Sequence, residues 1–149
     1  MTAAREGSDA TVSAVPLGSN MSLHIEESTR EDVLILTLTG QITFGEADDI
    51  RQKISELAAA GHLKLVLGLR DVFYIDSTGL GALVGGYVTL QNKKGTVKLV
   101  NPNKRNLELL LMTQLHTVFE VFDQLDDAVN SFFPERQSKR FDFLTLRRK

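Results

Sequence analysis

One short stretch of the chain combines an acid, two hydroxyls and two closely spaced glycines. It reads Asp76-Ser77-Thr78-Gly79-Leu80-Gly81, and it lies between the apolar residues 72–75 and an apolar segment with helical periodicity. The first N–H groups of a helix lack intrahelical partners, and the helix dipole favours negative charge there. A hydroxyl at such a junction can therefore cap the helix or accept a phosphoryl group. Ser77 is the candidate phosphorylation site and Thr78 the weaker one, with plain helix capping as the alternative for Ser77 and for Asp76.

The glycines of this stretch do not make a nucleotide-binding loop. The pattern G-x-G-x-x-G is incomplete, because Val84 follows Gly79 and Gly81 where the third glycine would stand, and no Gly-Lys-Ser/Thr sequence comes after. A glycine inside a helix costs roughly 1 kcal/mol relative to alanine, so each needs a reason. We expect close helix packing to explain Gly85 and Gly86, and the close approach of a partner to explain Gly79 and Gly81.

Residues that would support catalysis are few. The stretch lacks the G-x-S-x-G of a nucleophile elbow. The chain has no cysteine and three histidines, His24, His62 and His116, of which the last two are expected at the surface. A Ser–His–acid hydrolase is the least favoured alternative, and thiol catalysis and Cys-ligated zinc are excluded. We therefore expect a protein that is not an enzyme and needs no cofactor or metal.

Composition and charge narrow the class of protein further. The 149 residues, 42% hydrophobic and 24% charged, suit one soluble domain with a proper core. The sequence has no apolar run of about 18 residues, the length needed to span a membrane. The first twenty residues do not resemble a secretory signal. The absence of cysteine fits a reducing compartment, so we expect a cytoplasmic protein. Six basic and two acidic residues gather in 135–149, which leaves an acidic body unsuited to nucleic acid.

Hydrophobic periodicity predicts strands and helices that alternate after an initial hairpin. Alternating residues predict strands at 23–25, 33–39 (ended by Gly40), 63–69, 97–100 and 118–122, and residues 71–75 lead from the third strand to the motif. The sequence Thr43-Phe44-Gly45-Glu46 matches a capping box and begins a helix that ends before Gly61. Further helices are expected at 77–92, after Asn101-Pro102, and after a cap at Asp123.

This order predicts an α/β fold. The first two strands form an antiparallel hairpin, and short connections through helices make the later strands parallel, with right-handed crossovers. The prediction is a mixed β-sheet covered by about four helices. It spans residues 21–134, between a flexible N-terminal arm at 1–20 and a basic C-terminal tail at 135–149.

The motif Ile75-Asp76-Ser77-Thr78-Gly79-Leu80-Gly81, preceded by a leucine-rich strand, resembles the signature of STAS domains. It resembles bacterial anti-sigma factor antagonists more closely, and the likeness extends over residues 33–133, about two-thirds of the chain. It includes Thr39-Gly40-Gln41-Ile42 and the strand before Asn101-Pro102. The resemblance implies a STAS-like fold for residues 21–134.

The resemblance also implies a function. In that family the antagonist binds an anti-sigma factor that is also an ATP-dependent serine kinase, and this frees the sigma factor for transcription. Phosphorylation of the serine, here Ser77, releases the antagonist, and a phosphatase restores it. Thr43, Asp76, Thr78, Gly79 and Gly81 would contact the partner. These antagonists commonly carry an acidic residue at the position of Thr43. Threonine can still cap the helix, but it lacks the charge with which the acid would contact the kinase. The alternative is a STAS scaffold or ligand-sensing module of a signalling or transport assembly.

The C-terminal residues 141–149 lie outside the resemblance. They begin with Phe141 and Phe143 in alternation and end with three cations. They could add an edge strand, pair with a second copy in a homodimer, dock on a partner, or remain disordered. One short basic cluster rarely anchors a protein, so stable membrane association is not expected.

Overall fold

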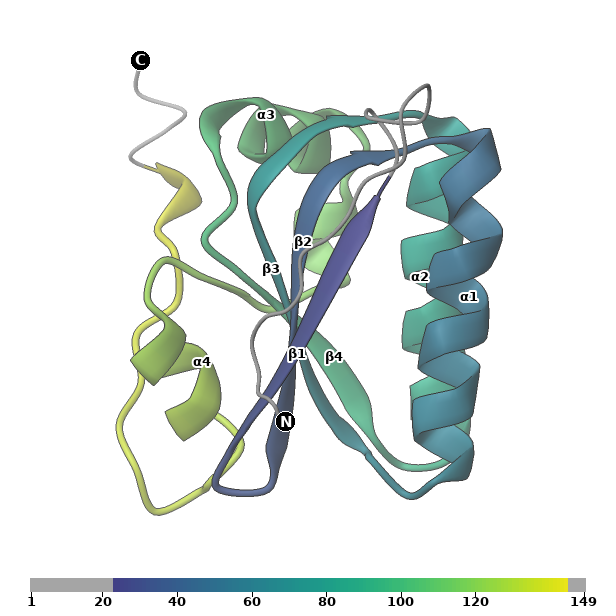
Figure 1. Cartoon of the computed structure of the whole chain (residues 1–149). Coiled ribbons are helices and arrows are strands. Elements are labelled where there is room, and N and C mark those ends of the chain that lie inside the picture. The colour runs from purple at the N-terminus through teal and green to yellow at the C-terminus, as the bar shows by residue number, and fades with distance from the viewer. Residues whose placement is uncertain (1–22, 145–149) are drawn as a thin grey trace, which may run out of the picture.

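The strands of the sheet lie side by side in the order in which they occur in the chain (Figure 1). The computed structural model describes residues 23–144, so the expected arm at 1–20 and the end of the tail at 145–149 lie outside the described residues. The elements are β1 (His24–Arg30), β2 (Val33–Ile42), α1 (Phe44–Ala59), β3 (Lys64–Ile75), α2 (Ser77–Asn92), β4 (Thr96–Val100), α3 (Lys104–Met112), the 3-10 helix η1 (Leu115–Thr117), β5 (Val121–Phe122) and α4 (Leu125–Asn130).

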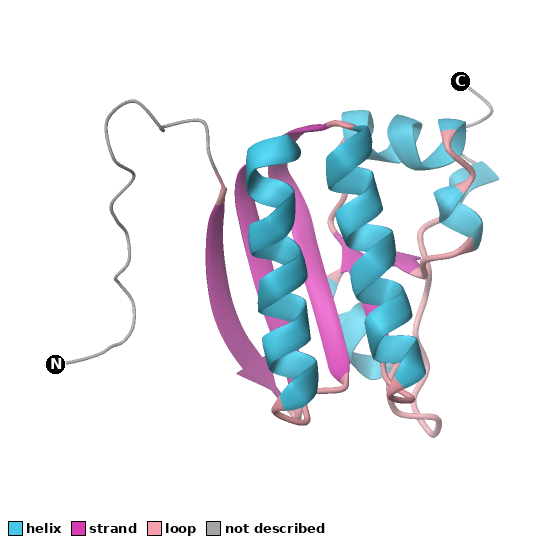
Figure 2. Cartoon of the chain, turned by 90° about the vertical axis from the view of Figure 1, so that its right-hand side faces the viewer, coloured by secondary structure: helices cyan, strands magenta, loops and turns pink. Residues whose placement is uncertain are grey.

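The predicted mixed sheet is confirmed. β1 and β2 are antiparallel, and every later pair of neighbouring strands is parallel. α1 and α2 lie next to each other over one face of the sheet (Figure 2). α4 covers part of the opposite face, and α3 lies near the end of the sheet where β2 and β3 finish (Figure 1). All strands after β1 therefore point their carboxyl ends to the same edge.

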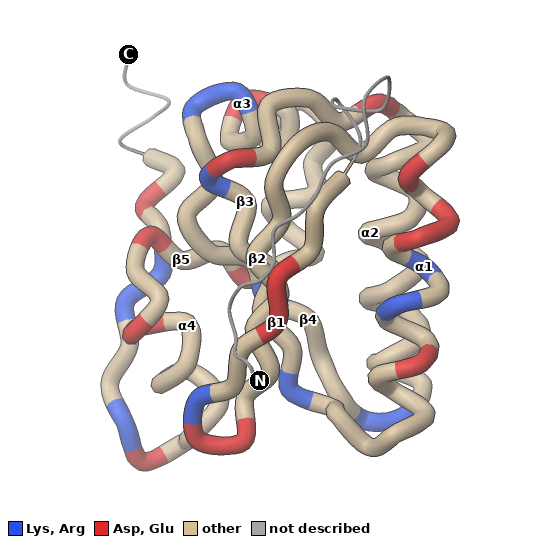
Figure 3. Tube along the Cα trace, viewed as in Figure 1, with Lys and Arg blue, Asp and Glu red and all other residues tan. Residues whose placement is uncertain are grey.

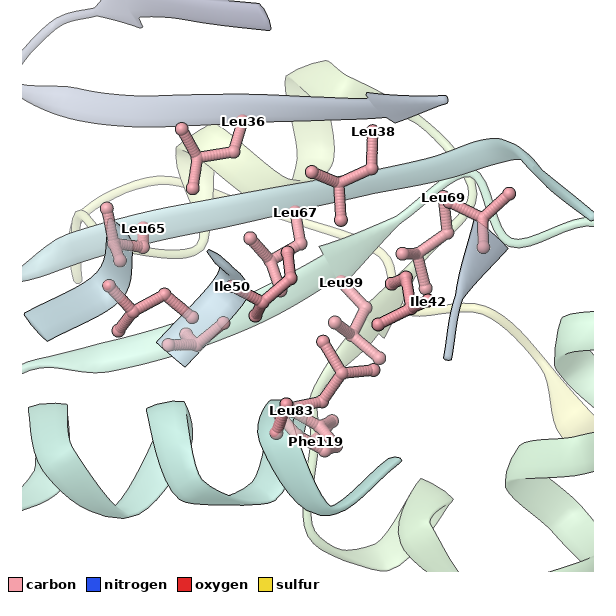
Figure 4. Packing of buried hydrophobic residues seen from close by; sticks show 14 of the residues in the cluster. Leu36, Leu38, Ile42, Ile50, Leu65, Leu67, Leu69, Leu83, Leu99 and Phe119 are labelled. Atoms are coloured by element: carbon pink, nitrogen blue, oxygen red, sulfur yellow. The ribbon is translucent and has the colours of Figure 1, made fainter. Parts of the chain in front are cut away.

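Alternate residues of the strands build two hydrophobic clusters, one on each face. Leucines from β2, β3 and β4 meet Ile50 and Ile54 of α1 and Leu83 of α2 on the face that these helices cover (Figure 4). The smaller cluster joins the other strand face to Ala128 and Val129 of α4. The inward stripe of α1 consists of Ala47, Ile50, Ile54 and Ala58, whereas Val88 of α2 is 48% exposed. The inward face of α2 is instead Gly79, Ala82, Leu83, Gly86 and Leu90.

Some predicted boundaries are wrong, and tertiary contacts explain the differences. β2 does not end at Gly40, because shifts in its register against β3 carry the pairing on to Ile42. The final strand is shorter than predicted, Val121–Phe122, since only these residues pair with β4. The observed β1 is longer than the predicted strand at 23–25, because its antiparallel pairing with β2 continues to Arg30.

Two helix starts also differ from prediction. α3 does not begin at Asn101-Pro102, because Asn101 adopts a left-handed φ of 54° and its N–H donates to the Phe122 carbonyl. Asn103 caps α3 instead, and its side chain accepts from the Asn106 N–H. α4 is preceded by Gln124 rather than by a capping Asp123, and no side chain caps it.

Candidate functional site

The predicted site residues lie where β2 and β3 end. Ile42 pairs with Ile75 at the last position of the two strands, and the Asp76 N–H donates to the Ile42 carbonyl at 3.2 Å. The next residues along each strand begin α1 and α2. Thr43 and Ser77, which are far apart in the sequence, therefore lie at the same edge of the sheet, as expected for the carboxyl ends of neighbouring parallel strands.

Asp76, and not Ser77, caps α2. The Asp76 carboxylate accepts from the Gly79 N–H at 2.8 Å, while its backbone carbonyl accepts from the Leu80 N–H. Ser77 is consequently the first residue of the helix, and it is exposed. No described residue forms a hydrogen bond with its hydroxyl. The capping alternative thus holds for Asp76 and is wrong for Ser77, whose hydroxyl remains available for chemistry.

The helix N-terminus offers Ser77 a favourable place for an anion. In the first turn the N–H groups of Ser77 and Thr78 have no intrahelical acceptors. The N–H of the next residue, Gly79, donates to the Asp76 carboxylate. Such N–H groups and the helix dipole stabilise a phosphate. Thr78 is half-buried, so its hydroxyl is less accessible than that of Ser77. The arrangement can hold a phosphoryl group on Ser77 without a change of fold.

Thr43 and Glu46 form the predicted capping box at the start of α1. The Glu46 carboxylate accepts from the Thr43 N–H at 3.0 Å and also contacts the Thr43 hydroxyl. A negative charge therefore lies at this helix start although Thr43 itself carries none. Further acidic residues follow on α1 (Figure 3), among them Asp48 and Asp49.

Glycines 79 and 81 have different surroundings. A Cβ at Gly79 would lie 2.0 Å from the Ile42 carbonyl oxygen, so the close approach there is made by the chain's own β2. A Cβ at Gly81 would meet nothing within 4 Å, and Gly81 is exposed one turn after Ser77. Packing also explains Gly86, which touches Ile54 of α1, but Gly85 has open space beside it.

Exposed apolar side chains, which the sequence pattern did not indicate, flank the site. Phe44 is 80% exposed at the start of α1, Tyr74 is 47% exposed near the end of β3, and Met112 is 79% exposed at the end of α3. A shallow groove of about 210 Å³ runs along Tyr74 and Met112. Phe44 stands outside the inward stripe of α1, and this position could have identified it as an exposed residue.

Side chains of α3 hold the strand that leads to the site. β3 pairs with β4 only as far as Gly68, and the following carbonyls of β3 have no strand partner on that side. Asn106 donates to Leu69 O at 2.9 Å, Asn103 to the carbonyls of residues 70 and 72 at 3.0 and 2.9 Å, and Arg105 to that of residue 73 at 3.2 Å. We call Asn103, Arg105 and Asn106 the α3 clamp. It positions the last residues of β3 and therefore Ser77.

Within residues 23–144, no hydrogen bond joins a histidine to Ser77. His62 is exposed, as predicted. His116 is half-buried in η1 against the Phe143 ring, with centroids 5.2 Å apart, so its predicted surface position is wrong. The contact comes from the tail, which the local sequence around His116 could not indicate. Within residues 23–144, no group of three or more His, Cys, Asp or Glu could hold a metal ion.

The fold and this helix start define a class of protein. A family model described as the STAS domain matches residues 24–128, and the chain belongs to the STAS domain family. Its curated relatives include the anti-sigma-B factor antagonist of Bacillus subtilis, which is 31% identical over 109 residues, covering 73% of this chain and 99% of the relative. The homologues that this chain resembles are thus bacterial anti-sigma factor antagonists.

Solved structures agree with this assignment. A crystal structure of a candidate anti-sigma factor antagonist from Thermotoga maritima has a TM-score of 0.68 and 25% identity, covering 72% of this chain and 92% of that one. The Bacillus cell fate determinant SpoIIAA, solved in its phosphorylated form, has a TM-score of 0.59 and 18% identity over 73% of this chain and 99% of that one. This second likeness shows a shared fold. Among the described residues, no helix is long and apolar enough to cross a membrane.

Proposed function

We propose that this protein is an anti-sigma factor antagonist that is switched by phosphorylation of Ser77. It binds an anti-sigma factor that is also a serine kinase, and phosphorylation releases it, so that it regulates sigma-factor-dependent transcription. A phosphatase restores the binding form. The observation that carries the proposal is the exposed Ser77 hydroxyl at the first position of α2, left free because Asp76 provides the cap. The antagonists among its relatives support the same role.

The switch follows from the charge that phosphorylation adds. A phosphoserine carries about −1.5 to −2 charges at pH 7. Inside the protein, the unpaired first-turn N–H groups accommodate this charge, so the domain stays folded. Across an interface, the phosphate adds to the nearby carboxylates of Asp76 and Glu46 and keeps an apolar partner surface away. Phosphorylation therefore weakens partner binding without unfolding the antagonist.

The surface that would meet the partner surrounds Ser77. The exposed Phe44 and Tyr74 provide apolar contacts on either side, and Gly81 lets a partner approach the helix closely. Thr43, Asp76, Thr78 and Gly79 position these residues through the two helix starts. The protein acts in the cytoplasm without catalysis of its own, through the domain at 21–134. The Bacillus protein solved in a phosphorylated form supports a phosphate on this fold.

Two measurements test the proposal. Incubation with ATP and a candidate anti-sigma factor kinase should place one phosphate on Ser77, located by mass spectrometry, and Ser77→Ala should remain unmodified. Ser77→Asp should lower partner affinity at least tenfold while the melting temperature stays that of the wild type. Ser28→Asp, an exposed position on β1, is the control for added charge. Phosphate on another residue, or unchanged affinity of Ser77→Asp, would contradict the switch and favour a constitutive STAS scaffold.

A further inference from the structure

A small hollow lies on the face of the sheet opposite α1 and α2, beside the start of α4. It has a volume of about 180 Å³ and is lined by residues of β2, β3, the turn after β4 and the start of α4. This is well below the roughly 300–1,000 Å³ of typical cofactor and drug sites, so it suits only a small molecule. The hollow and Ser77 are on different surfaces, and the inference below does not depend on the proposed phosphorylation.

Gly68 lines this hollow, and neither backbone conformation nor packing explains a glycine there. A glycine inside a strand weakens the strand, and it often marks a place where a ligand approaches closely. The φ of Gly68 is outside the left-handed region, so any residue could adopt it. A Cβ would meet its nearest atom at 3.7 Å, which is ordinary van der Waals contact. Space for a side chain thus exists at the middle of β3 and is left open.

Two opposite charges line the same hollow without pairing with each other. Arg70 and Asp71 both border it, yet no ion pair or side-chain hydrogen bond joins either to a described residue. Thr37 and Asn101 add a hydroxyl and an amide. A simple anion would bind Arg70 but be repelled by Asp71. A simple cation would bind Asp71 but be repelled by Arg70. A ligand that carries both charges satisfies both residues.

The remaining walls are apolar. Ile35, Val100 and Leu125 border the hollow beside the charged pair. Ile35 and Val100 are 3% and 2% exposed and Leu125 is half-buried, so together they leave a small apolar surface for a short hydrocarbon group. The small volume excludes a long or aromatic group. Charge of both signs next to a small apolar surface matches the chemistry of an α-amino acid with a short aliphatic side chain.

We propose that this hollow binds a small zwitterion of that class. The ligand carboxylate bonds to the Arg70 guanidinium, its ammonium group faces the Asp71 carboxylate, and its side chain contacts Ile35 and Leu125 over Gly68. Both charged residues are exposed, so each contact is screened by water and binding is weak, in the millimolar range. Weak, reversible binding is what a sensor of abundant metabolites requires.

Titration of the isotope-labelled full-length protein with L-valine, followed by amide NMR shifts, tests this inference. Shifts should concentrate at Gly68, Arg70, Asp71 and Asn101, and acetate or methylamine alone should bind at least tenfold more weakly. Equal binding of acetate would reduce the hollow to a simple anion site and overturn the proposal. The absence of saturable shifts with glycine, alanine, valine and leucine would also overturn it.

Variants connect the binding to the hollow itself. Gly68→Ala places a methyl group in the hollow and should weaken the binding at least tenfold, while the melting temperature stays equal or rises because the methyl group meets no atom closer than 3.7 Å. Arg70→Gln and Asp71→Asn should each weaken binding about tenfold. Arg51→Gln on α1 and Gly85→Ala on α2, both on the other side of the sheet, should bind like the wild type. Undiminished binding by Gly68→Ala would exclude this site.

Discussion

Asp76 caps α2 with its side chain, and this contact leaves the neighbouring hydroxyl of Ser77 exposed. Asp76→Ala removes the acceptor for the Gly79 N–H, so we expect the free energy of unfolding to fall by about 1 kcal/mol. Asp76→Asn keeps a capping oxygen and should be nearly as stable as the wild type. Urea denaturation of the three proteins measures the difference. Equal losses in both variants would show that charge, rather than the cap, stabilises this helix start.

Gly79 and Gly81 provide a matched pair of substitutions two residues apart on α2. In Gly79→Ala the new methyl group collides with the Ile42 carbonyl, so β2 and α2 must separate. We expect a loss of about 1–3 kcal/mol in the free energy of unfolding, as for other overpacked sites. Gly81→Ala meets no atom and should be neutral or stabilising by up to about 1 kcal/mol. Thermal unfolding distinguishes the two, and a strongly destabilised Gly81→Ala would contradict the open space beside it.

Gly81→Ala has a second use, because the methyl group projects toward the surface where we place the partner. If a partner helix or loop packs closely there, its affinity should fall while the antagonist becomes no less stable. Calorimetric titration with the anti-sigma factor measures this. Gly85→Ala, further along α2 and also without neighbours, is the control. If both variants bind the anti-sigma factor as tightly as the wild type, the partner does not contact this face of α2.

At the scale of elements, the side chains of the α3 clamp donate to β3 carbonyls beyond the point where the pairing with β4 ends. Asn106 is 2% exposed and donates to Leu69 O, so its removal leaves a buried carbonyl without a donor. We expect Asn106→Ala to cost about 1–3 kcal/mol in the free energy of unfolding. Glu108→Ala, at an exposed position on the same helix, should change it little. Chemical denaturation measures the free energy of unfolding of both variants. An unchanged value for Asn106→Ala would mean that water replaces the lost donor.

The elements also show what could be predicted from the sequence. Periodicity, the capping box at Thr43 and the short connections correctly predicted the hairpin, the parallel strands and both long helices. The same local patterns placed Ser77 and Asp76 together at a helix start. The α3 clamp, the exposure of Val88 and the hollow at Gly68 depend on contacts between distant segments. Only the packed structure determines which side of a helix or strand meets a neighbour.

In the whole molecule, the described part of the tail, residues 135–144, packs against the domain. The Arg136 side chain donates to Glu31 in the β1–β2 turn at 2.6 Å, and this hydrogen bond holds the pKa of Glu31 below its ordinary value. The Phe141 N–H donates to the Val121 carbonyl at the free edge of β5. Phe141 and Phe143 meet edge to face and pack on the main hydrophobic cluster. The described part of the tail, 135–144, thus covers an edge that residues 24–128 alone would leave open.

Deletion of residues 135–149 should leave a folded but weaker domain. Loss of two half-buried aromatic rings lowers the free energy of unfolding by about 2 kcal/mol. Deletion of residues 145–149 alone preserves both rings and should lower stability less than the longer deletion. Thermal and urea unfolding of the two truncated proteins measure the effect. Equal stability of the longer deletion and the wild type would show that these contacts contribute little.

The strand order has a consequence for synthesis on the ribosome. Each strand pairs with the strand made just before it, from β1 to β5, so no strand waits for a distant partner. The β1–β2 hairpin closes a short loop, whereas each later parallel pairing spans a crossover helix and is intrinsically slower to form. The nascent sheet can grow strand by strand as the chain emerges. Its growing edge stays open until residues beyond β5 are made, and an exposed edge can pair with other chains. Phe141, which follows β5 in the chain, donates its N–H to the Val121 carbonyl at that edge.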